Sequence, residues 1–339
     1  MKRRSITLRG LAGAALITAG CLTSVSAQAQ WKPEKPVTVV VPWGAGGSTD
    51  QVVRVVAQEL QQALGQTVVV VNQPGASGSI GTKSVLEGDK DGTQMASGAA
   101  KDLGTYAVSG LLDTKAEDWH LYLAVINASV VGVNSATPYN SLDDLIKAMQ
   151  EKPGSVTVAT AGITSSGGDG LRQLQEAFGV EAKQITYDGG NPAVIATVGG
   201  ETEATTQLGV EQAEMLRAGK LRGLAVMSSK PLSLEGVDPI PPITDFKSDF
   251  KLADNYFGIF VPKGVPQDVT DTLDRIWTEI LPKSEGLAKY AQGRGAIVAV
   301  LHGDEALKAV MPAIRVAAYG LVARNQAKID PATIGIEKP

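Results

Sequence analysis

Two runs of β-branched residues, at positions 37–41 and 68–71, flank a segment with helical periodicity. Continuous apolar runs of this kind are typical of strands buried on both faces, as in a parallel sheet covered by helices. The apolar positions of the intervening segment are Val52, Val53, Val56, Leu60 and Leu64. Gly65 stands where a helix of that length would end. The pattern therefore predicts a β-α-β unit with a right-handed crossover.

The alternation of short strands and helices continues to the end of the chain. Strands are predicted at residues 94–97, 155–159, 184–187, 221–227 and 256–261, and helices from Ser141 and at 171–178, 213–218, 269–281 and 305–325. Residues 231–242 hold four prolines without periodicity and predict a loop. The alternation favours an α/β fold of two lobes with a ligand cleft between them.

The predicted strand at 256–261 would return the chain to its first block. We therefore assign residues 30–125 and about 256–300 to the first lobe, and residues 126–255 to the second. The C-terminal helix, about 303–325, is expected on the second lobe or across the hinge. A length of 339 residues, with 43% hydrophobic and 19% charged positions, suits such a globular protein with a substantial core.

The first 29 residues have the composition of a secretory signal peptide. Four basic residues precede an apolar stretch at 11–22, which is too short to span a bilayer, and Ala27-Gln28-Ala29 forms a cleavage site. Export could follow the general route or, through Arg3-Arg4, the twin-arginine route. Cys21 leaves open a lipoprotein cleavage site. No later segment is expected to cross a membrane.

Charge and cysteine content exclude several classes of function. Loss of the four basic leader residues takes the formal net charge from −4 to −8. An acidic protein is a poor partner for nucleic acid or an anionic membrane surface. Cys21 is the only cysteine, so cleavage after Ala29 would leave no thiol for a disulfide, a metal site or catalysis.

Three glycine-rich polar loops each follow a predicted strand, at residues 43–50, 72–81 and 160–169. Glycine lets the backbone approach a ligand closely, and serine and threonine hydroxyls can donate to it. The first loop opens a helix, whose N-terminal N–H groups and dipole favour an anion. Ligands of open α/β sheets bind at the carboxyl ends of strands. We therefore expect the loops to share one anionic ligand, although each could also serve only as a turn or cap.

Individual side chains in these loops leave alternatives open. Trp43 could contact the apolar part of a ligand or pack in the core. Asp169 is expected to cap the helix that follows it. Asp188 could accept from a ligand hydroxyl, amine or acid group, or could be a turn residue before Gly189.

Motifs for catalysis and cofactors are weak. The segment from Gly44 to Thr49 departs from a dinucleotide fingerprint at its third glycine, and Asn72 stands where an acidic ribose partner is expected. The chain has no phosphate-loop motif and no nucleophile elbow. His120 and His302, the only histidines, lie in segments unlike a site, so we predict no catalytic residue, cofactor or metal.

These loops resemble a known family. The likeness extends over essentially the whole predicted mature chain. The segments that carry it most clearly are Lys35 to Asp50, which contains Pro-Trp-Gly-Ala-Gly-Gly-Ser-Thr-Asp, Leu64 to Asn72, and Pro74 to Gly81. Asp91-Gly92, Tyr187 to Gly190 and Phe257 to Pro262 also fit. The chain is similar to Bug-type periplasmic solute-binding proteins of tripartite tricarboxylate transporters.

The resemblance implies a type II-like, Venus-flytrap periplasmic binding protein that captures a small carboxylate and hands it to a pair of membrane permease subunits. Typical family ligands are di- and tricarboxylates, acidic amino acids and some aromatic acids. The ligand-binding positions carried over are Trp43, Gly44, Ala45, Gly46, Gly47, Ser48, Ser77, Gly78, Ser79, Thr160, Ala161, Thr164, Ser165, Ser166, Tyr187, Asp188 and Asn191. No catalytic residue is implied.

Two positions depart from the family pattern. Trp43 replaces a common phenylalanine, and Asp188 replaces a frequent lysine that could pair with a second carboxylate. The expected function is a monomeric, non-enzymatic periplasmic receptor for a di- or tricarboxylate or an aromatic carboxylate such as a benzene dicarboxylate. A sensory adaptor that presents ligand to a membrane kinase, and a periplasmic enzyme acting on a carboxylate, are the alternatives.

Overall fold

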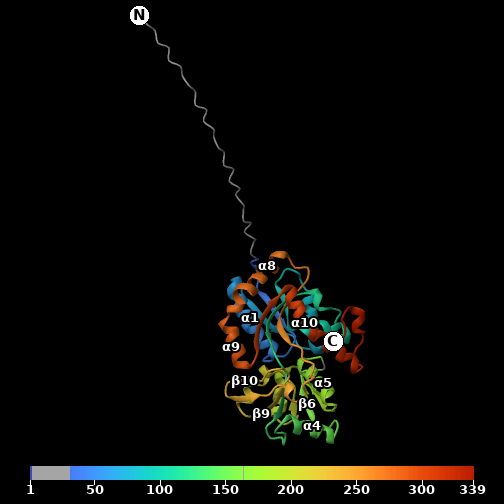
Figure 1. Cartoon of the computed structure of the whole chain (residues 1–339). Coiled ribbons are helices and arrows are strands. Elements are labelled where there is room, and N and C mark those ends of the chain that lie inside the picture. Colours follow the sequence, from blue (N-terminus) through green and yellow to red (C-terminus); the bar gives the residue numbers. More distant parts are fainter. Residues whose placement is uncertain (2–30, 163) are drawn as a thin grey trace.

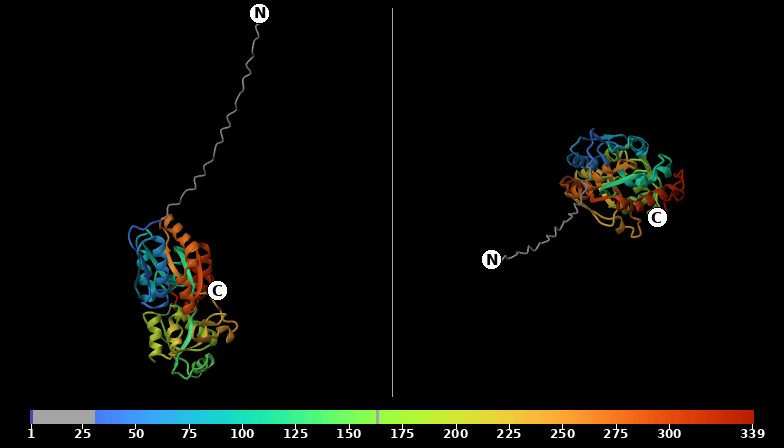
Figure 2. Two further views of the ribbon diagram at one scale, coloured as in Figure 1. Left: turned by 90° about the vertical axis from the view of Figure 1, so that its left-hand side faces the viewer. Right: turned by 90° about the horizontal axis from the view of Figure 1, so that it is seen from above.

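The computed structural model describes Met1 and residues 31–162 and 164–339, so the predicted signal peptide lies outside the described residues apart from Met1. Two α/β lobes stand one above the other (Figure 1), and the same division is clear from the side (Figure 2). The upper lobe is built on a six-stranded sheet of order β13-β4-β12-β3-β1-β2. The lower lobe is built on a five-stranded sheet of order β7-β6-β8-β5-β9. The expected two-lobed α/β architecture is confirmed.

The first lobe begins with the predicted β-α-β unit. Its strands are β1 (Val37–Val41), β2 (Val68–Asn72), β3 (Gln94–Ala99), β4 (Trp119–Ile126), β12 (Tyr256–Pro262) and β13 (Ile297–His302). Its helices are α1 (Ser48–Leu64), α2 (Ser79–Leu86), α3 (Ala100–Ser109), α8 (Gln267–Arg275), α9 (Glu285–Arg294) and α10 (Gly303–Ala323). Strands β1 and β2 pair in parallel, with Val37 opposite Val68, and β12 returns to pair with β3 and β4.

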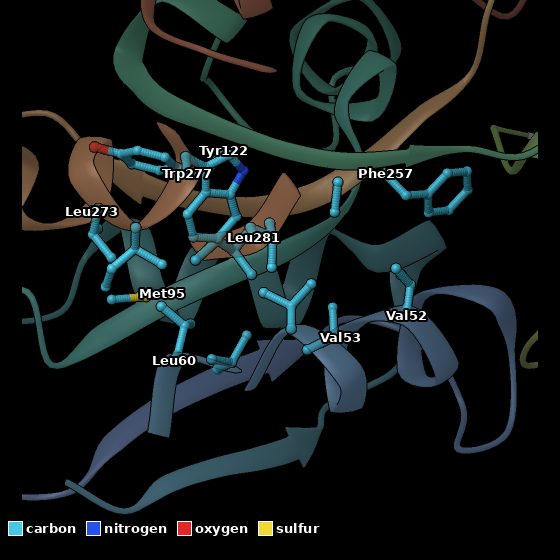
Figure 3. Close-up of a cluster of buried hydrophobic side chains, with 14 of the residues drawn as sticks. Val52, Val53, Leu60, Met95, Tyr122, Phe257, Leu273, Trp277 and Leu281 are labelled. Atoms are coloured by element: carbon cyan, nitrogen blue, oxygen red, sulfur yellow. The ribbon is translucent and has the colours of Figure 1, made fainter. Parts of the chain in front are cut away.

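The apolar face of α1 lies in the main core of this lobe. Figure 3 shows Val52, Val53 and Leu60 of α1 gathered with apolar side chains of β3, β4 and α8. Trp277, in the short π-helical segment Ile276–Ile280 that continues α8, packs against Tyr122 with the ring centres 5.0 Å apart and the ring planes tilted by 58°, and it donates its indole N–H to the Leu123 carbonyl at 2.7 Å. Because its polar atom is paired, the indole can be buried without an unsatisfied donor.

The second lobe repeats the alternation on a smaller sheet. Its elements are β5 (Val130–Asn134), α4 (Leu142–Glu151), β6 (Thr157–Thr160), α5 (Ser166–Phe178), β7 (Lys183–Thr186), α6 (Gly190–Val198), β8 (Ala204–Thr205), α7 (Gly209–Arg217) and β9 (Leu221–Val226). The predicted capping box forms at α4, where Ser141 accepts from the Asp144 N–H at 3.2 Å and the Asp144 carboxylate accepts from the Ser141 N–H. In the parallel pair β6–β7, the glycine-rich loop at 160–169 follows β6, and the segment from Tyr187 to Gly190 follows β7.

The later part of the chain differs from the sequence-based expectations in two places. Residues 231–242, expected as a loop, contain the two short antiparallel strands β10 (Leu232–Leu234) and β11 (Val237–Ile240). Helix α10, expected on the second lobe or across the hinge, packs mainly on α3 and β4 of the first lobe and also contacts α5 of the second. Within the described residues α10 is also long and apolar enough to cross a membrane, but its apolar side covers the first lobe's core.

Chain segments that run side by side join the lobes. The chain leaves β4 at Asn127 and returns into β12 through Asn255, and the Asn127 N–H donates to the Asn255 carbonyl at 3.0 Å. The Asn255 amide also donates to the Ser166 hydroxyl at 2.8 Å, at the start of α5. This connection forms one edge of the space between the lobes, and the glycine-rich loops of the two lobes meet away from that edge.

Candidate ligand-binding site between the lobes

The loop between β1 and α1 is shaped by one carboxylate. Asp50 accepts from the Gly46 N–H at 2.9 Å and from the Asn72 amide at 3.0 Å, and it pairs with Arg54 at 2.8 Å. Gly46 has φ of 79°, a conformation that glycine adopts without strain. The helix is capped by Gly47 and has no side-chain cap, so the Ser48 N–H is available to a partner outside the helix.

Loops of the second lobe lie directly against this loop. A Cβ atom added to Gly44 would lie 2.8 Å from the Asp188 carbonyl oxygen, and one added to Gly46 would lie 3.2 Å from the Asn191 amide nitrogen. On the neighbouring loop, the Ser77 hydroxyl lies 3.2 Å from the Cβ position of Gly162. At Gly44 the opposing atom is backbone, so only a bare glycine backbone allows the lobes to approach so closely, whereas at Gly46 and Gly162 a Cβ would require the opposing side chain to shift.

The partner of the Ser48 N–H is Glu211 from α7 of the second lobe. Its Oε1 accepts from the Ser48 N–H at 2.8 Å, while Oε2 accepts from the Leu208 N–H at 3.3 Å. The Gln207 amide, oriented to suit its neighbours, donates to the same Oε2 at 2.9 Å. Burial raises the pKa of Glu211, although the hydrogen bonds donated by Ser48 and Leu208 act in the opposite direction and lower it. A protein carboxylate therefore occupies the positive end of α1.

A second buried contact between the lobes centres on Lys101 of α3. This ammonium is 5% exposed and lies 2.6 Å from Asp169 of α5, 3.0 Å from Asp102 and 3.1 Å from the Thr164 carbonyl. Asp169, expected to cap α5, instead pairs with Lys101, and the cap is Ser165. Its Asp102 and Asp169 partners hold the pKa of Lys101 above its usual range despite burial. One cation thus serves two carboxylates from opposite lobes.

Asp102→Asn should remove the part of the pH dependence of the protein's unfolding free energy that comes from the Asp102 carboxyl group. Burial raises the pKa of Asp102 to about 6, although Lys101 opposes the rise, so the folded protein binds a proton that the unfolded chain releases at about pH 4. The contribution is fully present below pH about 4 and is lost as pH rises through about 6, by up to about 3 kcal/mol.

The measurement is urea unfolding of the wild type and Asp102→Asn across this window. The exposed Asp113→Asn on the loop after α3 is the control. The difference in unfolding free energy between wild type and Asp102→Asn should change with pH, and the control should track the wild type. A constant difference would contradict the buried, proton-binding carboxyl.

A cavity of about 20 Å³ lies where these contacts meet. It is lined by Trp43, Ser48, Thr49, Asp102, Ala161, Ser165, Ser166, Gln207, Leu208, Glu211 and Phe257. Such a volume holds roughly one water molecule. A ligand with several carbon atoms therefore fits only if groups that line the cavity move from the positions they have here.

Five of the residues predicted from the sequence line this cavity: Trp43, Ser48, Ala161, Ser165 and Ser166. Six others form the contacts around it between the lobes: Gly44, Gly46, Gly47, Ser77, Asp188 and Asn191. Asp188 takes part through its backbone carbonyl, since its side chain is exposed. The sequence thus predicted which loops lie at the site. It did not predict whether a given residue takes part through its side chain or through its backbone.

The remaining predicted residues have other roles in this conformation. Ser79 donates to the Ala76 carbonyl, Thr160 accepts from Gln184, and Tyr187 donates to Glu201. Gly78 lies against Trp43, Ala45 is exposed, and the buried Thr164 hydroxyl has no partner among the described residues. Thr164 is therefore a donor still available near the cleft.

Sequence reasoning missed three charged residues of the site, Lys101, Asp102 and Glu211. Lys101 and Asp102 directly follow β3, so the rule that placed the three loops would also have placed them. Glu211 follows β8, which has two residues and too little pattern to be detected. Neither histidine lines the cavity, and the described part of the chain contains no cluster of His, Cys, Asp and Glu suited to a metal.

The fold and this site define a class of protein. Two α/β lobes joined by connecting segments, with glycine-rich loops of both lobes meeting at a helix N-terminus, form a two-lobed solute-binding protein. The family profile described as tripartite tricarboxylate transporter family receptor (TctC) matches residues 52–285. The chain belongs to this receptor family, which includes the Bug proteins.

Individual relatives agree over most of the chain. Protein BugT of Bordetella pertussis is 30% identical over 301 residues, covering 86% of this chain and 90% of that protein. The structure of the periplasmic binding protein BugD has a TM-score of 0.77 at 25% identity and covers 91% of this chain and 100% of its own. An R. palustris protein solved with adipate has a TM-score of 0.75 at 24% identity, covering 87% and 98% of the two chains.

Proposed function

We propose that the protein is a periplasmic receptor that binds a small organic carboxylate between its lobes and delivers it to the membrane permease subunits of a tripartite tricarboxylate transporter. The observation that carries the proposal is the Ser48 N–H at the start of α1, which already holds a carboxylate at 2.8 Å. The same backbone donor can hold the acid group of a ligand without any Lys or Arg.

The other groups around the cavity suit binding without chemistry. Neutral donors and acceptors come from Ser165, Ser166 and Gln207, and apolar walls come from Trp43 and Phe257. Solved relatives carry adipate in one case and malate in another, which supports the choice of a carboxylate for this chain. A di- or tricarboxylate and an aromatic carboxylate are the candidate classes, and the protein acts as a monomer exported by its N-terminal leader.

The mechanism is a shift between open and closed lobes. A ligand bound by loops of both lobes favours closure only if its contacts are better in the closed state. The closed form is then the one that docks on the permease, through polar and transient contacts that suit an acidic surface.

The test is a thermal-shift screen of residues 30–339 after denaturation and refolding, which strips any ligand carried through purification. The panel contains aliphatic mono-, di- and tricarboxylates, amino acids and aromatic acids. A ligand at 100 times its dissociation constant should add about 2.7 kcal/mol of stability. Absence of any shift from folded protein would reject the carboxylate receptor.

Ser48→Pro makes the screen specific for the proposed donor. Proline suits the first position of a helix and removes the N–H that would hold the ligand, together with the Ser48 hydroxyl. Loss of a hydrogen bond to a charged group costs about 1.5–3 kcal/mol, so the affinity should fall roughly 10- to 100-fold. Glu285→Pro, at the exposed first position of α9, is the matched control and should bind as the wild type does.

A further inference from the structure

The donor that the proposed function assigns to the ligand is already bonded to the protein itself. Glu211 Oε1 lies 2.8 Å from the Ser48 N–H, and the carboxylate is 8% exposed. A ligand carboxylate can reach this N–H only by displacing Glu211. The inference drawn here therefore rests on the proposed function and concerns which carboxylates the site accepts.

Glu211 stays close to the ligand after it is displaced. It belongs to α7, and its second oxygen is held by the Leu208 N–H and by Gln207. The backbone of Gly190 lies directly behind the carboxylate, since a Cβ there would be 2.1 Å from it. Separation of the lobes thus moves Glu211 away from α1 but keeps it on the opposite wall of the same cleft.

The charges around the cavity do not compensate for a second anion. The charged residues that line it are Asp102 and Glu211, both acidic. The nearby Lys101 is already shared between Asp102, Asp169 and the Thr164 carbonyl. A ligand carboxylate on α1 would therefore lie beside an unpaired carboxylate in a poorly hydrated space, where like charges repel strongly. A dicarboxylate would add a further negative charge.

We propose that Glu211 selects ligands that carry a protonated amino group next to the carboxylate. The ligand carboxylate would take the Ser48 N–H, and its ammonium group would take the displaced carboxylate of Glu211. Trp43 and Phe257 line the same cavity, and aromatic rings attract a cation that lies over their faces. An amino carboxylate of this kind replaces the bond between Ser48 and Glu211 by two bonds and pairs the displaced Glu211 carboxylate with a cation.

The test compares ligands that differ only in the amino group, using calorimetry on the refolded mature protein. Suitable pairs are succinate with aspartate, propionate with alanine, and 3-phenylpropionate with phenylalanine. In at least one pair the wild type should bind the amino acid 10-fold or more tightly than the plain acid. Glu211→Gln should abolish that preference by weakening the amino acid and strengthening the plain acid. Glu211→Asp, which keeps the charge, should retain it.

Glu214→Gln is the matched control, because Glu214 lies on the same helix and is exposed to solvent. It should leave both affinities unchanged. If Glu211→Gln raised the affinity for both ligands of a pair equally, the inference would be overturned, because Glu211 would then only compete with the ligand carboxylate for the Ser48 N–H. Equal affinity of the wild type for both members of every pair would also overturn it, while leaving the carboxylate receptor intact. No binding of any ligand would reject the proposed function and this inference together.

Discussion

Lys101→Met is expected to destabilise the protein by about 3–5 kcal/mol, the range for removal of one partner from a buried ion pair. The ammonium is 2.6 Å from Asp169 and 3.0 Å from Asp102, and all three side chains are buried. Methionine fills a similar volume but leaves two carboxylates without a cation. Most of the loss is therefore the cost of the remaining buried charges and not of the lost attraction itself.

Urea unfolding at neutral pH measures this effect. Lys83→Met is the matched control, because Lys83 is exposed and pairs with the exposed Glu87 at 3.7 Å, a contact worth at most about 1 kcal/mol. The double variant Lys101→Met/Asp169→Asn should recover part of the lost stability by removing one of the stranded charges. A loss no larger than that of Lys83→Met would show that the cluster is hydrated and not buried.

Gly44→Leu is expected to hold the lobes apart and to weaken ligand binding at least about 100-fold, equivalent to roughly 3 kcal/mol. Even a Cβ atom at this position would lie 2.8 Å from the Asp188 carbonyl oxygen, which is backbone and cannot turn away. Gly44 has no positive φ, so leucine does not strain its own loop. The first lobe should fold normally, and the effect should fall on closure.

Two measurements on the same samples separate closure from folding. Small-angle scattering with ligand should show a smaller radius of gyration for the wild type and no change for Gly44→Leu. Gly293→Leu, on α9 with nothing within 4 Å of its Cβ position, should behave as the wild type does. Unchanged affinity of Gly44→Leu would mean that the ligand is held with these loops further apart than in this structure.

The importance of Lys101 and Glu211 has a common physical origin. Each closes the space between the lobes with a buried charge and not with apolar surface. Apolar contact would hold the lobes together in any solvent, whereas a buried charge is stable only while its partners are in place. A ligand that offers new partners can therefore change the balance between the open and closed lobes.

The sequence alone determined the local architecture and the family. The apolar run at Val37–Val41, the helical spacing after it and the glycines of the first loop each report on a few neighbouring residues. Local backbone preference and burial were enough to predict the β-α-β unit, the return of β12 and the glycine-rich loops. The same short-range logic missed β8, which has two residues, and the hairpin at 231–242, whose strands are stabilised by each other and by their packing.

Only the tertiary structure decided how the charges of the site are arranged. Ser48 and Glu211 are separated by 163 positions, and Lys101 and Thr164 by 63. No periodicity links such residues, because their contact depends on the packing of one lobe against the other. An acidic residue on a surface helix and one that fills an anion site have the same appearance in a sequence. Burial and the geometry of the partner tell them apart, and these exist only once both lobes are folded and in contact.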